Sequence, residues 1–82
     1  MTILGITPRL LHYLERRGLK KQFEKKKMLF ENNPFHPGLE TEILGPRHLR
    51  VYSFRISQKY RAIFIYLDDG SVEIIDINNH YR

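Results

Sequence analysis

The stretch SFRISQKYRAIFIY, residues 53–66, contains two strand-forming runs that are separated by a short polar link. If residues 57–59 form a three-residue hairpin loop, the apolar side chains of the two strands face one another, which supports this register. The same register places Arg55 directly opposite Arg61. Because like charges in opposed positions destabilise a sheet, this pair needs either an anion between the two guanidinium groups or an acidic partner for each.

Both explanations of the arginine pair are open at this point. Planar guanidinium groups match phosphate oxygens in a bidentate way, which would favour a phosphate-binding site. Alternatively, each arginine pairs with an acid of the same sheet. The candidate acids are Glu42, Glu73 and Asp76. Since two strand arginines lie next to a basic region of the sequence, we favour the phosphate explanation.

The rest of the chain predicts a small α+β domain, in which a two-helix hairpin packs on one side of a mainly antiparallel four-stranded sheet. Thr7 is typical of a helix N-cap and is followed by a proline, and Gly18 suits a helix C-terminus. The expected elements are a strand at residues 2–6, helices from Pro8 to about Gly18 and from about Leu19 to Glu31, and strands at residues 50–56, 60–67 and 72–78.

Length and composition narrow the possible classes of protein. With 82 residues, we expect one domain, residues 1–82. The chain has no cysteine, and no histidine pair has metal-ligand spacing, so the sequence predicts neither a disulfide nor a zinc site. It has no apolar stretch of the ~20 residues that cross a bilayer. We therefore expect a soluble cytoplasmic protein without a membrane partner.

The charge of the chain is unevenly distributed. The formal net charge is +5, and the basic residues concentrate in residues 9–27 and 47–61. Two basic blocks on a small domain indicate a surface for a polyanion. A solvated basic surface that only aids solubility is the alternative, and for the lysines of the second helix the two interpretations are equally open.

Four segments together resemble the RelE/ParE superfamily of type II toxin–antitoxin toxins. They are LETEILG (residues 39–45), YSFRISQKYRAIFIY (52–66), DDGSVEIIDI (68–77) and HYR (80–82). The branch they are most similar to is that of the mRNA interferases, which includes RelE-like and YoeB-like proteins. The resemblance implies a compact α+β toxin that cuts mRNA in the ribosomal A site without a metal or other cofactor. It also implies an antitoxin protein as partner.

The resemblance also implies roles for five residues. Arg61 would hold the scissile phosphate, and Arg55 would assist it. Glu42 falls where YoeB-like toxins carry a general base for the attacking 2′-hydroxyl. His80 would protonate the leaving 5′-oxygen, and Tyr81 would orient the 2′-hydroxyl or stack on a base.

Further basic side chains are expected to contact the RNA backbone. They are Lys20, Lys21, Lys25, Arg47, Arg50 and Lys59. Two other functions stay open on the same scaffold, namely a ParE-like inhibitor of DNA gyrase and a degenerate toxin that only binds. The adjacent His80 and Tyr81 favour the nuclease, because inhibition of gyrase needs no proton donor there.

Overall fold

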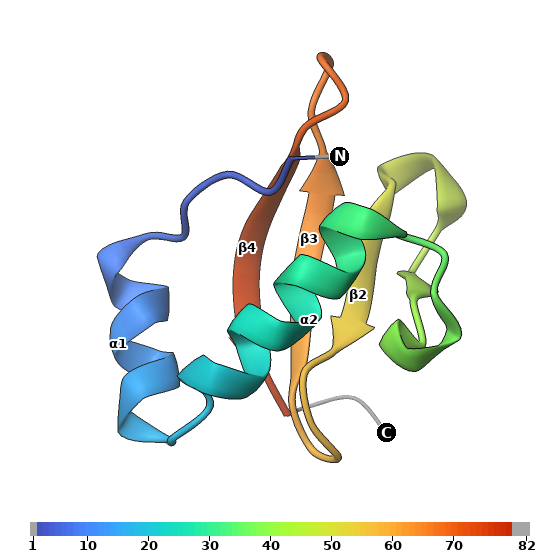
Figure 1. Ribbon diagram of the computed structural model, residues 1–82. Coiled ribbons are helices and arrows are strands. Elements are labelled where there is room, and N and C mark those ends of the chain that lie inside the picture. Colours follow the sequence, from blue (N-terminus) through green and yellow to red (C-terminus); the bar gives the residue numbers. More distant parts are fainter. Residues whose placement is uncertain (1, 80–82) are drawn as a thin grey trace.

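The computed structural model describes residues 2–79 and has two layers. Two α-helices lie on one face of a four-stranded antiparallel sheet with the strand order β1-β2-β3-β4, and α2 crosses the sheet diagonally (Figure 1). The predicted α+β class is thus confirmed. The elements are α1 (Pro8–Arg16), α2 (Lys20–Asn32), β1 (Glu42–Leu44), β2 (Val51–Arg55), β3 (Arg61–Tyr66) and β4 (Val72–Asn78), with short 3₁₀ helices η1 (Pro37–Leu39) and η2 (Arg47–Leu49).

The first helix begins and ends where its sequence signals predict. Thr7 is the N-cap, and its side-chain oxygen accepts a hydrogen bond from the backbone N–H of Leu10 at 3.3 Å. Pro8 occupies the first turn, where its missing N–H leaves no helical bond unmade. After the C-cap Arg17, the chain turns at Gly18 with a φ of +65°, which glycine adopts without steric cost.

The core lies between α2 and the sheet and is largely aromatic. Phe23 and Phe30 of α2 pack on the sheet, where the ring centroid of Phe30 lies 5.5 Å from that of Phe54 and 5.2 Å from that of Phe64. All four phenylalanines are buried. Burying each such side chain stabilises the fold by about 1.5–3 kcal/mol, so these contacts fix α2 on one particular face of the sheet.

The hairpin register predicted from the sequence is confirmed. Strands β2 and β3 pair with Phe54 opposite Ala62 and Arg55 opposite Arg61. The backbone N–H of Ile56 bonds to the carbonyl of Tyr60 at 2.9 Å and closes the loop of residues 57–59. The two guanidinium groups therefore start from neighbouring strands at the same level of the sheet.

The structure corrects the expected position of the fourth strand. Residues 2–6 were expected to form it, but this segment contributes a single parallel bridge between Ile3 and Val72. The fourth strand is β1, in which Glu42 pairs with Ser53. Three residues are too few to show a clear strand periodicity, which explains why the sequence alone did not predict β1.

Candidate active site

The arginine pair lies on the face of the sheet that is turned away from the helices. Side chains alternate between the two faces of a strand. Because Phe54 and Phe64 face α2, Arg55 and Arg61 face the opposite side. Across the sheet, Arg61 is paired on its other side with Asn78 of β4. The neighbouring level on the same face contains Glu42, Ser53, Ile63 and Asp76.

Arg61 is buried and is held by several partners. Only 6% of the residue is exposed. Its Nε donates a hydrogen bond to the Oγ of Ser53 at 2.8 Å, and its Nη2 donates to the backbone carbonyl of Glu40. The same Nη2 lies 3.8 Å from the carboxylate Oε1 of Glu42. This guanidinium group is therefore fixed in position by the fold itself.

Arg55 is more accessible and is held less firmly. About a third of its side chain is exposed, and its Nε lies 3.1 Å from the carboxylate Oε2 of Glu40. The N–H at this Nε is buried but does not point at a hydrogen-bond acceptor among residues 2–79. The contact with Glu40 is thus an ion pair without an aligned hydrogen bond, which leaves the guanidinium group able to take a better-placed anion.

Each arginine therefore has a carboxylate partner in this structure, as the second explanation of the pair expected. Glu42 was one of the candidate acids, whereas Glu40 was not. Glu73 and Asp76, the other two candidates, form no ion pair with either arginine within residues 2–79. The side chains of both glutamates that do pair are 54% exposed, so the site is open to solvent on the side of the acids.

The structure brings Arg55, Arg61 and Glu42 together, and it leaves two predicted members of the site undescribed. His80 and Tyr81 lie outside the described residues. In the sequence they follow Asn78, the β4 partner of Arg61, by two and three positions.

Of the six basic residues predicted to contact RNA, only Lys59 lies close to the arginine pair. It belongs to the exposed loop that joins β2 to β3, next to the level of Arg55 and Arg61. Arg47 and Arg50 are exposed at the opposite end of β2. They are separated from Arg55 by the length of the strand, about 13 Å at 3.3 Å per residue.

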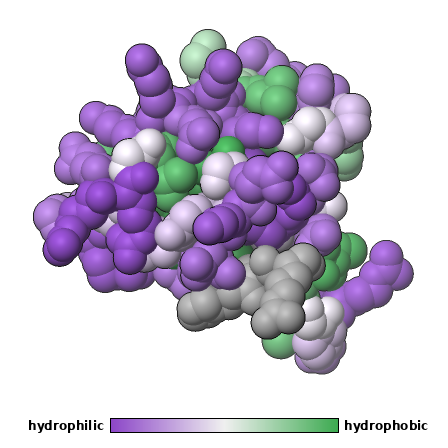
Figure 2. Space-filling view, turned by 90° about the horizontal axis from the view of Figure 1, so that it is seen from below, coloured by the Kyte–Doolittle hydropathy of each residue, from purple (hydrophilic) through white to green (hydrophobic). Residues whose placement is uncertain are grey.

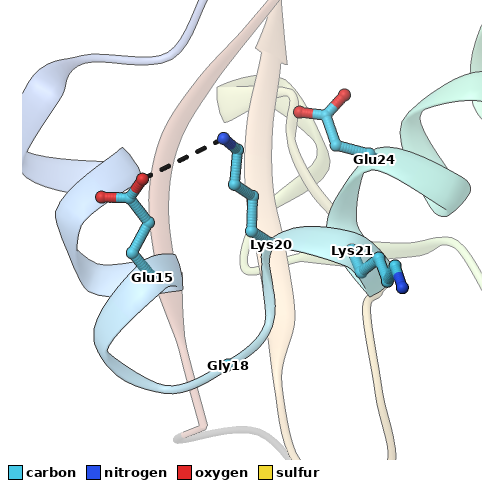
Figure 3. A pocket seen from close by; sticks show the side chains of 5 residues that line it. All are labelled: Glu15, Gly18, Lys20, Lys21 and Glu24. Atoms are coloured by element: carbon cyan, nitrogen blue, oxygen red, sulfur yellow. Dashed lines mark ion pairs between the residues drawn. The ribbon is translucent and has the colours of Figure 1, made fainter.

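The predicted lysines of α2 belong to the helical layer, on the other side of the sheet. A hollow of 480 Å³ lies at the turn between the two helices. Its lining includes Lys20 and Lys21 together with Glu15 and Glu24 (Figure 3). Lys20 reaches toward Glu15, with 4.0 Å between the charged atoms. Lys25 is exposed on the same helix. The acids of this hollow reduce its attraction for a polyanion.

A more uniformly basic surface lies on α1, within the basic block of residues 9–27, although none of its residues was named as an RNA contact. We call it the α1 groove, a hollow of 560 Å³ lined by Arg9, His12, Tyr13, Arg16 and Arg17. None of its arginines forms an ion pair within the described part of the chain. The spacing of residues 9, 12 and 16, which repeats at three and four positions, was the sequence signal that could have revealed it.

Two aromatic rings link the α1 groove to Tyr60, the residue before β3. The guanidinium carbon of Arg17 lies 3.6 Å from the ring centroid of Tyr13. The ring of Tyr13 in turn meets that of Tyr60 edge-on, with 6.2 Å between the centroids, and Tyr60 directly precedes Arg61. Burial raises the pKa of Tyr13 above the usual value for a phenol. Hydrophilic side chains cover much of this end of the molecule (Figure 2).

Neither a membrane segment nor a metal centre is evident between residues 2 and 79. No helix in this range combines the length and the hydropathy that crossing a bilayer requires. The same range contains no group of three or more histidine, aspartate or glutamate side chains that could hold a metal ion.

The structure resembles solved toxin structures over nearly the whole chain. A YoeB/ParE toxin from Agrobacterium tumefaciens matches 99% of this chain and 100% of its own, with a TM-score of 0.72 and 18% sequence identity. A chain of the heterotetrameric YoeB–YefM toxin–antitoxin complex from Staphylococcus aureus matches 99% of this chain and 98% of its own, with a TM-score of 0.69 and 20% identity. A further YoeB–YefM complex from the same organism has a TM-score of 0.60, also at 20% identity.

The predicted RelE/ParE fold is confirmed by these likenesses, which lie at the level of structure. No family model matches this chain, and no curated protein sequence matches it.

Proposed function

We propose that this chain is the toxin of a type II toxin–antitoxin system and that it cleaves mRNA as a metal-independent endoribonuclease. The observation that carries the proposal is the contact between Glu42 and the buried guanidinium group of Arg61, at 3.8 Å. A carboxylate that can accept a proton thus lies beside a fixed cation that can hold a phosphate. Glu42 and Arg61 belong to a fold that this chain shares with YoeB toxins.

In the proposed reaction, a 2′-hydroxyl group of the RNA attacks the adjacent phosphorus atom. Glu42 accepts the proton of this hydroxyl group as the new bond between the 2′-oxygen and phosphorus forms. The bond between phosphorus and the 5′-oxygen breaks, and His80 gives that oxygen a proton. The products are a 2′,3′-cyclic phosphate and a free 5′-hydroxyl group, and no metal ion is needed for the balance of charge or protons.

The fixed position of Arg61 supports its role in the transition state. Negative charge grows on the non-bridging phosphate oxygens as the pentavalent phosphorus forms. A donor that is already oriented stabilises this charge without reorganisation during the reaction. Ser53 and the carbonyl of Glu40 provide this orientation, since both accept hydrogen bonds from the guanidinium group.

The roles of His80 and Tyr81 rest on their place in the sequence. Two residues of extended chain span at most about 7 Å. His80 follows Asn78 by two positions, and Asn78 is the strand partner of Arg61. On this ground we propose His80 as the proton donor at the same phosphate, and Tyr81 as the residue that orients the 2′-hydroxyl group or stacks on a base.

The proposed partners follow from the charge and from the structural neighbours. The net charge of +5 and the α1 groove suit an RNA strand or the ribosome. A cognate antitoxin is proposed because the Staphylococcus aureus neighbours are complexes of the toxin YoeB with the antitoxin YefM. An antitoxin segment with acidic and apolar residues would neutralise the basic surface and block the site.

The test is cleavage of mRNA on translating ribosomes, with mapping of the chemical ends of the products. Arg61→Ala is expected to lower the cleavage rate roughly 10²-fold or more, the scale for the loss of one preorganised transition-state donor. Glu42→Gln is the second variant, because it removes the proposed base and keeps the shape of the side chain. Undiminished cleavage by a folded Arg61→Ala protein would refute the assignment, and inhibition of gyrase supercoiling without RNA cleavage would favour the ParE-like function.

A further inference from the structure

We propose that Glu40 is an additional functional residue of the site, which positions Arg61 and which occupies the phosphate position at Arg55 until the substrate displaces it. This inference rests on the proposed function, because it names how the same site receives its substrate. It is carried by the two separate contacts of one residue, its backbone carbonyl with Arg61 and its carboxylate with Arg55.

The backbone of Glu40 is fixed in an unusual conformation. Its φ of +45° lies in the left-handed region, which residues other than glycine rarely adopt. The residue ends η1, where its N–H bonds to the carbonyl of Pro37 at 3.1 Å, and the preceding Leu39 is fully buried. This turn directs the carbonyl of Glu40 at the Nη2 of Arg61. The positioning contact therefore depends on the backbone and not on the charge of the side chain.

The side chain of Glu40 makes the weaker of the two contacts. The side chain is 54% exposed, and its carboxylate lies 3.1 Å from the Nε of Arg55 without an aligned hydrogen bond. An ion pair of this exposed kind changes an equilibrium by at most about fivefold. A phosphodiester group offers oxygens that match the guanidinium fork in a bidentate way. It can therefore replace the carboxylate at Arg55, while the carbonyl continues to hold Arg61.

The experiment measures binding and not cleavage, so that its outcome does not depend on the proposed chemistry. The probe is a single-stranded 2′-O-methyl oligoribonucleotide, which has no free 2′-hydroxyl group to attack the phosphorus. Glu40→Gln is compared with Glu73→Gln, which changes the net charge equally at an exposed position of β4 on the same face. We expect Glu40→Gln to bind the probe about two- to fivefold more tightly than Glu73→Gln does, because only Glu40 competes for Arg55.

Two further variants separate the parts of the inference. Glu40→Gly keeps the carbonyl and suits a φ of +45°, so it is expected to give the same gain in affinity and a higher unfolding midpoint in urea. In an Arg55→Gln background, the gain from Glu40→Gln should vanish. Equal binding by the Glu40→Gln and Glu73→Gln proteins would overturn the inference, as would a gain that persists without Arg55.

The outcomes for the two proposals can be distinguished. If the unaltered protein cleaves no RNA but Glu40→Gln still tightens binding through Arg55, the exchange at Arg55 stands and the nuclease assignment fails. If the protein cleaves RNA and Glu40→Gln binds no better than the control, the nuclease assignment stands and the role of the Glu40 carboxylate fails.

Discussion

The sharpest structural prediction concerns Ser53, the residue beneath the buried arginine. Ser53 is fully buried, and its Oγ accepts the hydrogen bond from the Nε of Arg61 at 2.8 Å. The change Ser53→Ala removes this single oxygen, leaves the backbone of β2 intact and adds no bulk. The Nε–H group of a charged side chain is then left without its acceptor in a site where only 6% of Arg61 is exposed.

The size of the effect follows from this geometry. A hydrogen bond to a charged group contributes about 1.5–3 kcal/mol to stability, and a buried donor without a partner loses that amount. For a chain of this length, the free energy of unfolding falls by about 1 kcal/mol per molar urea. The unfolding midpoint of Ser53→Ala should therefore lie about 1.5–3 M below that of the unaltered protein.

The measurement is urea unfolding followed by far-UV circular dichroism. The matched control is Ser57→Ala in the β2–β3 loop, because the Ser57 hydroxyl makes no side-chain hydrogen bond within residues 2–79. Its midpoint should stay within about 0.5 M of the starting value. If the two variants unfold at the same concentration of urea, Ser53 does not hold Arg61 and the account of a preorganised guanidinium group is wrong.

Three further predictions address the helix start, the α1 groove and the turn between β3 and β4. Thr7→Ala should lower stability by about 1 kcal/mol, measured by urea unfolding, since it removes the N-cap acceptor. Replacing Arg9 and Arg16 together by Gln should weaken oligoribonucleotide binding and reduce the salt slope by about 0.7 for each phosphate that the variant no longer neutralises, measured by fluorescence anisotropy at several salt concentrations. Hydrogen bonds from the Oγ and N–H of Ser71 lower the pKa of Asp69, so its stabilisation should be present at neutral pH and be lost as the pH falls below the usual carboxyl value of about 3.9. The unfolding midpoint of Asp69→Ala should thus lie below that of the unaltered protein at pH 7, and the two midpoints should coincide in strong acid.

Much of the fold could be predicted because local signals and long-range packing agree. Thr7, the proline after it and Gly18 set the bounds of α1 through backbone rules that hold in any context. The hairpin register followed from matching apolar partners, since a shift by one residue would turn every side chain of a strand to the other face. The short strand β1 was not predicted. Its three residues are stabilised by pairing with β2, and a local sequence pattern contains no signal for this pairing.

The site was predictable in its side chains and less so in its contacts. Arg55, Arg61 and Glu42 were identified, and the structure places them on one face of the sheet. Glu40 was not, because its contact with Arg61 uses a backbone carbonyl that points at the guanidinium group only after η1 has formed. Backbone acceptors carry no residue-type signal, so they become apparent only in three dimensions.

The bridge between Ile3 and Val72 has a consequence for the way in which the chain emerges during its synthesis. Translation proceeds from the N-terminus, but the segment at Ile3 and the inner face of α2 have no sheet to dock on until β2, β3 and β4 have been made. The β4 partner of Arg61 is likewise added late, because Asn78 follows it by seventeen positions. A nascent polypeptide should therefore lack the assembled arginine pair until nearly the whole domain has been synthesised, so the site forms only at the end of elongation.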